Sequence, residues 1–240
     1  MIVKNTNEGW RIITQTNHAF LATQIAQALK ENFRTEYWLE TLLAISNHET
    51  LETDFNSGER INNLNLPIDF REATSSKKEL YSKIESMVRK ASNRSIIVGA
   101  LIAEHLLFLH KPDINKKSII SLCEDTIKNA KSLHKIDDIT FEKMYGVVRF
   151  CDRLSLMICT EELPDLDRKF EINDSLDIGK VFLYLKDKNI KVTPWPFQKE
   201  TCSIYIEHKL LTKSHFKDDS DFINVFHKSL VESSIFELSK

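Results

Sequence analysis

The chain has 240 residues, of which 42% are hydrophobic and 28% are charged, and its formal net charge is −2. This length suits one large domain, or a domain of roughly 150 residues with a smaller addition, and the composition is ordinary for a soluble globular protein. The balanced charge argues against a generally basic nucleic-acid binder. No stretch approaches the roughly 18 apolar residues of a membrane span, and the start carries no apolar signal core. We therefore expect a cytoplasmic protein that does not enter the membrane.

Two kinds of periodicity divide the chain. Up to about residue 165, apolar residues recur at helical spacing, whereas from about residue 169 short β-branched and aromatic runs indicate strands. In the first part, the sequence predicts a hairpin over 2–5 and 10–14, followed by a helix over 17–32 that is capped by Thr16 or Asn17. A second helix is expected from a cap at Thr35 to about residue 49. Further helices are expected over 76–91, 93–110, 115–133 and 139–161. The second part predicts strands in FEI, KVFLYL, IKVTPWPF, CSIYIEHKLL and SIFEL, with a short helix over 220–230.

These elements predict a mainly α protein, built as a bundle of about six helices with an N-terminal β-hairpin and a C-terminal β-rich part. The expected units are residues 1–165 for the helical domain and residues 166–240 for the β-rich part packed on it. Because an isolated hairpin is marginal in water, both β pieces are expected to join one small sheet. Residues 51–74 form a long polar segment, which favours a functional role such as covering a site.

Histidines and acids lie where a helical core should be apolar. His18 opens the first predicted helix, the doublet His48-Glu49 closes the second, and His105 and Asp152 lie inside the apolar runs IIVGALIAEHLLFL and VVRFCDRLSLMIC. Burying such a group without a partner costs several kcal/mol, so we expect these side chains to converge on one another or on a metal ion. Imidazole with carboxylate suits Mn, Fe, Co, Ni or Zn. The sequence therefore predicts a divalent transition metal bound by His18, His48, Glu49 and Asp152.

Each residue also has a purely structural explanation. His18 near a helix start can simply be exposed, and a histidine at a helix end, such as His48, commonly caps the helix. His105 alone is more often a hydrogen-bonded core residue, Glu49 can be solvated, and Asp152 beside an arginine suits an ion pair. Only their occurrence together, on different helices, favours a shared site.

The predicted function is metal-dependent hydrolysis of a phosphate ester or nucleotide, because a bound metal ion lowers the pKa of its water and neutralises a phosphoryl oxygen. His105 and Asp54 are expected to contact the substrate or to add a metal ligand, and no residue is assigned as catalytic acid or base. The expected partner is a small phosphorylated or anionic ligand, and a homo-oligomer is left open. The alternatives are a non-catalytic protein that binds a small anion or nucleotide on the same scaffold, and an interaction module whose C-terminal strands pair with a partner's sheet.

Several motifs resemble a known family. The segments MIVKN…WRIITQTNHAFLATQIA, LLAISNHE…D, LPIDF and RFCDRLSLMIC are similar to a bacterial domain of unknown function, whose members show ITQxDHaxLA, HDdGW and DrLSLxlC patterns. That family in turn resembles the HD superfamily of helical metal-dependent phosphohydrolases. The resemblance implies an HD-like bundle with a metal at His18, His48, Glu49 and Asp152, and it also matches Asp54. The doublet is His-Glu here in place of His-Asp, and the aromatic segment after it is missing, which implies an adjusted ligand geometry.

Overall fold

The computed structural model describes residues 1–49, 59–73, 76–110, 112–161, 163–164, 168–186 and 189–240. The helices are α1 (Gln15–Ala28), the short 3-10 helix η1 (Glu31–Phe33), α2 (Trp38–Asn47), α3 (Lys77–Arg94), α4 (Ile96–His110), α5 (Lys117–His134), α6 (Asp138–Cys159) and α7 (Asp219–Lys228). The strands are β1 (Ile2–Thr6), β2 (Gly9–Ile13), β3 (Phe170–Asn173), β4 (Val181–Lys186), β5 (Asn189–Thr193), β6 (Thr201–Leu211) and β7 (Val231–Ser239).

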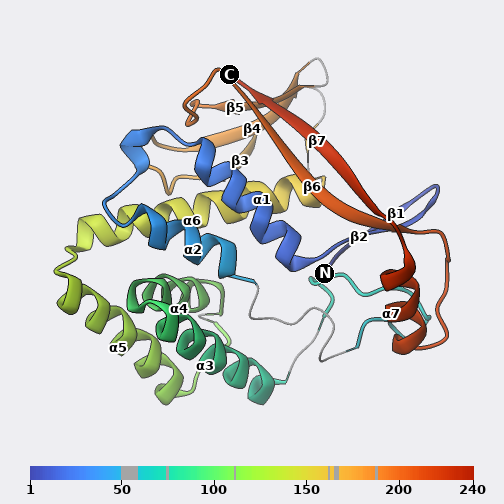
Figure 1. The fold of residues 1–240 in the computed structure, drawn as a ribbon, viewed down its shortest axis with the longest axis horizontal. Coiled ribbons are helices and arrows are strands. Elements are labelled where there is room, and N and C mark those ends of the chain that lie inside the picture. The colour runs from blue at the N-terminus through green and yellow to red at the C-terminus, as the bar shows by residue number, and fades with distance from the viewer. Residues whose placement is uncertain (50–58, 74–75, 111, 162, 165–167, 187–188) are drawn as a thin grey trace.

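The strands form one seven-stranded mixed sheet in the order β1-β2-β6-β7-β5-β4-β3. Figure 1 shows this curled sheet along one side of the molecule, with α1 and α6 beneath it and α3, α4 and α5 beyond them. Over the described residues the chain is 50% helical and 22% strand. The fold is therefore α/β, and the expectation of a mainly α, HD-like bundle is wrong.

The correction has a physical reason in the length and pairing of β6. This strand has 11 residues and pairs with β7 along nearly its whole length, while its C-terminal end pairs antiparallel with β2. One strand thus joins the N-terminal hairpin to the C-terminal strands, which confirms the expectation of a shared sheet. The sheet is mixed because β5 runs parallel to β7. The division at residue 165 stays a prediction.

The first helix begins and ends earlier than the sequence suggested. Thr14, rather than Thr16 or Asn17, is its N-cap, because the Thr14 hydroxyl accepts a hydrogen bond from the backbone N–H of Asn17 at 3.1 Å. This cap satisfies one of the unpaired N–H groups at the start of a helix. The shift places His18 within the first turn of α1, facing the core.

The main apolar core lies between the helices and the inner face of the sheet. α4 is buried along most of its length. α1 packs on α2, α6 and β6, and α4 packs on α2 and α6, so four helices meet around one region of this core. A smaller apolar cluster lies beneath α7 and is formed by Met1, Ile12, Leu211, Phe216, Phe222 and Phe226. Among the helices that could be searched, none is both long and apolar enough to cross a membrane.

Gly146 allows α6 to approach the segment after β3, and its substitution tests this packing. A methyl group there would overlap the backbone oxygen of Ser175, whose hydroxyl donates to the Gly146 carbonyl at 2.7 Å. We expect Gly146→Ala to lower the free energy of unfolding by about 1–3 kcal/mol, as overpacking usually does. Urea denaturation measures this, with Glu142→Ala, exposed on the same helix, as the control. An unchanged stability for Gly146→Ala would contradict the close approach.

Candidate metal centre

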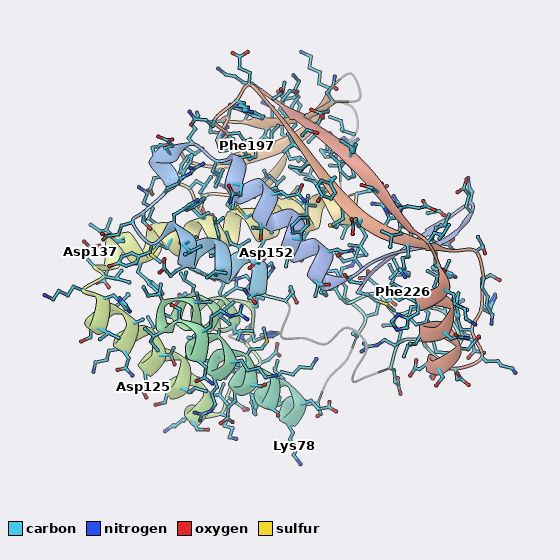
Figure 2. The ribbon with its side chains drawn as sticks, in the orientation of Figure 1. Lys78, Asp125, Asp137, Asp152, Phe197 and Phe226 are labelled. Atoms are coloured by element: carbon cyan, nitrogen blue, oxygen red, sulfur yellow. The ribbon has the colours of Figure 1, made fainter. Side chains whose placement is uncertain are left out.

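Four helices bring the predicted ligands together in the core. His18 comes from α1, His48 follows α2, His105 lies within α4 and Asp152 within α6, and their exposed fractions are 0, 3, 2 and 8%. Figure 2 places Asp152 near the middle of the molecule, where α1, α2 and α6 meet. Two overlapping groups, one of His18, His48 and Glu49 and one of His48, His105 and Asp152, have all their ligand atoms within 4.8 Å of one another. Groups of this kind could hold a metal ion.

The carboxylate of Asp152 is the point on which the histidines converge. Its Oδ1 lies 3.0 Å from Nε2 of His18 and 3.3 Å from Nε2 of His48, and these two nitrogens are 3.2 Å apart. Its Oδ2 lies 3.8 Å from Nε2 of His105, which is too long for a hydrogen bond. The ring of His48 meets the other two edge to face, at centroid distances of 5.1 Å and 5.4 Å. We call these four residues the histidine–aspartate cluster.

Hydrogen bonds behind the rings determine which nitrogen of each histidine carries the proton. Nδ1 of His48 lies 2.6 Å from the carbonyl oxygen of Ile45, where it can only donate. The Ser155 hydroxyl donates to the carbonyl of Asp152 at 2.8 Å, so its oxygen accepts from Nδ1 of His18 at 2.9 Å. A neutral imidazole that is protonated on Nδ1 has its lone pair on Nε2. Both Nε2 lone pairs therefore point toward each other and toward Asp152.

Such an arrangement of acceptors requires a cation among them, either a metal ion or a proton. Burial lowers the pKa of His48, but the hydrogen bond and the charge of Asp152 outweigh it and raise this pKa to about 9. Burial also lowers the pKa of His18, and Asp152 offsets only part of that effect. Burial raises the pKa of Asp152, yet the hydrogen bonds with His18 and His48 hold it well below its usual range. Without a metal, the proton is therefore held by His48.

The end of α2 explains how His48 reaches this position. The last carbonyls of a helix lack partners within it, and Nδ1 of His48 supplies one to Ile45. The same hydrogen bond turns Nε2 inward, so His48 can cap the helix and face the cluster at the same time.

Ser155 was not predicted from the sequence. Its place three residues after Asp152, on the same face of α6, is the signal that could have found it.

The remaining sequence candidates have different surroundings. Asp54 lies outside the described residues. Glu49 is half-buried beside His48. Arg153, the partner considered for Asp152, is exposed. His208, outside the predicted site, is buried on β6, with its Nε2 3.5 Å from the carboxylate of Glu232.

The pH dependence of stability tests the burial of His105. Burial lowers the pKa of His105 to about 4, and the charge of Asp152 offsets only part of this. The unfolded histidine protonates below the ordinary value of 6.5 while the folded one does not. In protein from which a chelator has removed any metal, the free energy of unfolding should therefore fall as the pH is lowered from 6.5 to 4. The loss is up to roughly 3 kcal/mol, at ~1.4 kcal/mol per pKa unit. Urea denaturation at several pH values measures this, and His105→Leu should lose that part of the slope. Equal slopes for both proteins would contradict the prediction.

Comparison with known proteins places the chain in a family. No curated protein and no solved structure matches it. The model of the family described as "Protein of unknown function (DUF3891)" matches residues 1–213. The matched part includes every residue of the histidine–aspartate cluster, together with Glu49 and Ser155. The prediction of an uncharacterised family is thus confirmed, while the further resemblance to the HD superfamily stays a prediction. The chain belongs to the DUF3891 family of proteins of unknown function.

Proposed function

We propose that His18, His48 and Asp152 bind a divalent transition metal ion, with Glu49 or His105 as further ligands. The observation that carries the proposal is the pair of Nε2 atoms 3.2 Å apart whose lone pairs face each other beside a carboxylate. Imidazole with carboxylate favours Mn, Fe, Co, Ni or Zn over Mg or Ca. The carbonyl and the hydroxyl behind the two rings are the kind of partners that orient metal-binding histidines.

The reaction proposed for this centre is hydrolysis of a phosphate ester or nucleotide. A metal ion bound here would lower the pKa of a bound water and neutralise charge on a phosphoryl oxygen. The buried histidines exclude bulk water from one side of the centre. Glu49 is half-buried, and the side chain of Asp152 retains 12% exposure, so water and substrate would approach from their side. In this proposal the carboxylate of Glu49 binds the ion or accepts a proton from water.

The alternative is a buried polar network on a scaffold that binds a small anion without catalysis. The raised pKa of His48 favours it, because a proton on that ring satisfies the same lone pairs as a metal ion would. A metal ion must displace this proton in order to bind. Metal content therefore separates the two proposals.

Asp152→Asn tests the metal directly. The amide has nearly the shape of the carboxylate and can donate to a histidine lone pair, so we expect the variant to fold. Its metal affinity should fall by more than the roughly 10- to 100-fold that follows loss of an outer hydrogen-bond partner. Elemental analysis of protein purified without chelators measures this, and Asp125→Asn, exposed on α5, should retain the metal. Wild-type protein that binds none of Mn²⁺, Fe²⁺ or Zn²⁺ would refute the proposal. Where a metal does bind, the loaded protein is screened for phosphoesterase activity, with the Asp152→Asn variant as the inactive control.

Ser155→Ala tests the orientation of His18. Without the hydroxyl, Nδ1 of His18 loses its acceptor at 2.9 Å and the ring loses its fixed tautomer. We expect metal affinity to fall about 10- to 100-fold while the protein stays folded. Competition with a fluorescent chelator measures the affinity, and Ser132→Ala, exposed on α5, is the control. Unchanged affinity in Ser155→Ala would mean that the hydroxyl does not orient a metal ligand.

A further inference from the structure

A series of aromatic rings leads from the histidine–aspartate cluster to the surface between α4 and α6. The ring of Tyr145 lies 6.2 Å from that of His105, and the ring of Phe108 lies 6.4 Å from that of Tyr145. The guanidinium carbon of Arg149 lies over the Phe108 ring, 4.5 Å from its centre. Phe108 is 51% exposed, whereas Tyr145 is 8% exposed. These four residues, called the α4–α6 seam below, connect the cluster with solvent.

Polar groups of the seam lack partners. Among the described residues, the hydroxyl of Tyr145, both ring nitrogens of His105 and Nε of Arg149 are buried without a hydrogen bond. A buried donor that stays unpaired costs most of its desolvation energy, and such groups are rare in native proteins. Several of them lie together here, where a water molecule or a ligand from outside the chain would satisfy them.

The spacing along α6 puts these groups on the same face of the helix as Asp152. Tyr145, Arg149 and Asp152 are separated by four and then three residues, so their side chains project from one face of the helix. His105 and Phe108 are three residues apart on α4, which packs against α6. Along α6, Arg149 thus lies between Tyr145 and Asp152, one helical turn from each.

The hydrogen-bond donors of the seam favour an oxyanion as ligand. Burial, and after it the charge of Glu104, raise the pKa of Tyr145, so its phenol keeps the proton that it can donate. The guanidinium offers N–H donors in a planar fork that matches phosphate oxygens. Because the charge of Glu104 opposes that of Arg149, the seam alone carries little net positive charge. A metal ion at the cluster would supply the charge that attracts the anion.

We propose that the α4–α6 seam is the phosphate-binding subsite of the proposed metal centre, with Arg149 and Tyr145 holding the oxygens of a phosphoryl group. This inference rests on the proposed metal centre and extends it by assigning the residues that recognise the substrate. The exposed end of the seam is Phe108 and the inner end is His105, which also belongs to the histidine–aspartate cluster.

The test is phosphate binding to the full-length protein loaded with Mn²⁺. Calorimetry gives the affinity for inorganic phosphate, and ³¹P relaxation by the paramagnetic ion shows whether phosphate binds beside the metal. Loss of a charged hydrogen-bond donor should weaken binding roughly tenfold or more in Arg149→Gln, and loss of a neutral one about three- to tenfold in Tyr145→Phe. Both variants should retain Mn²⁺. The controls Arg153→Gln and Tyr205→Phe, at exposed positions, should bind phosphate as the wild type does.

The outcomes distinguish the subsite from the metal centre. Wild-type protein that holds Mn²⁺ and binds no phosphate overturns the subsite alone, and so does undiminished phosphate binding by Arg149→Gln and Tyr145→Phe. A loss in Arg153→Gln as large as that in Arg149→Gln also overturns it, because general attraction of anions then explains the binding. Wild-type protein that holds neither Mn²⁺ nor, when these are offered instead, Fe²⁺ or Zn²⁺ overturns the metal centre and the subsite together. If Arg149→Gln fails to fold, Arg149→Lys keeps the charge, loses the fork and is expected to weaken binding.

Discussion

The contact between the carboxylate of Asp152 and the Nε2 atoms of His18 and His48 is the constraint on which the rest of this structure depends. These atoms lie within 3.3 Å of one another in a core built from apolar helices. Since water cannot screen charges there, a cation among these acceptors contributes far more than it would at the surface. The packing of α1, α2 and α6 around that point is therefore coupled to the occupancy of the cluster, whether by a proton or by a metal ion.

The sheet supports this cluster from the other side of α1. The side-chain amide of Gln24 donates to the backbone carbonyl of Tyr205 at 2.9 Å and accepts from its N–H at 3.1 Å, and Asn17 donates to the carbonyl of Glu207 at 2.9 Å. Paired hydrogen bonds of this type hold the helix at a fixed rotation over β6. Because Asn17 precedes His18 directly, these bonds also fix the side of α1 from which the histidine projects. The strands that looked like an addition to a helical bundle thus help to position a candidate ligand.

The sequence allowed local structure to be predicted much better than long-range pairing. His105 and Asp152 could be identified because a single polar residue within an apolar helix needs a partner. Tyr145 could not, because tyrosine is ordinary in a helical core and only its neighbours reveal a role, and Ser155 could be found only through its spacing of three residues from Asp152. The pairing of β2 with β6 joins residues about 200 positions apart, and no local pattern encodes such a register. His208 is different: it follows the buried Ile204 and Ile206 at intervals of two residues, so the period of the strand already puts it on the same inner face.

Charge balance connects the cluster, Glu49 and the α4–α6 seam. A divalent ion held by neutral histidines and by Asp152 alone would leave one positive charge in a buried place, which is unfavourable without a counter-charge. Glu49 can supply that counter-charge from its half-buried position, and an anion entering along the seam can supply it as well. In the proposed centre, Glu49 on the ion would make the site neutral and weaken its attraction for an anion. An oxyanion would then bind strongly only in exchange for Glu49, whose carboxylate would accept a proton from water in that state. The side chain of glutamate is one methylene longer than that of the aspartate expected at this position, and this extra reach would favour such an exchange.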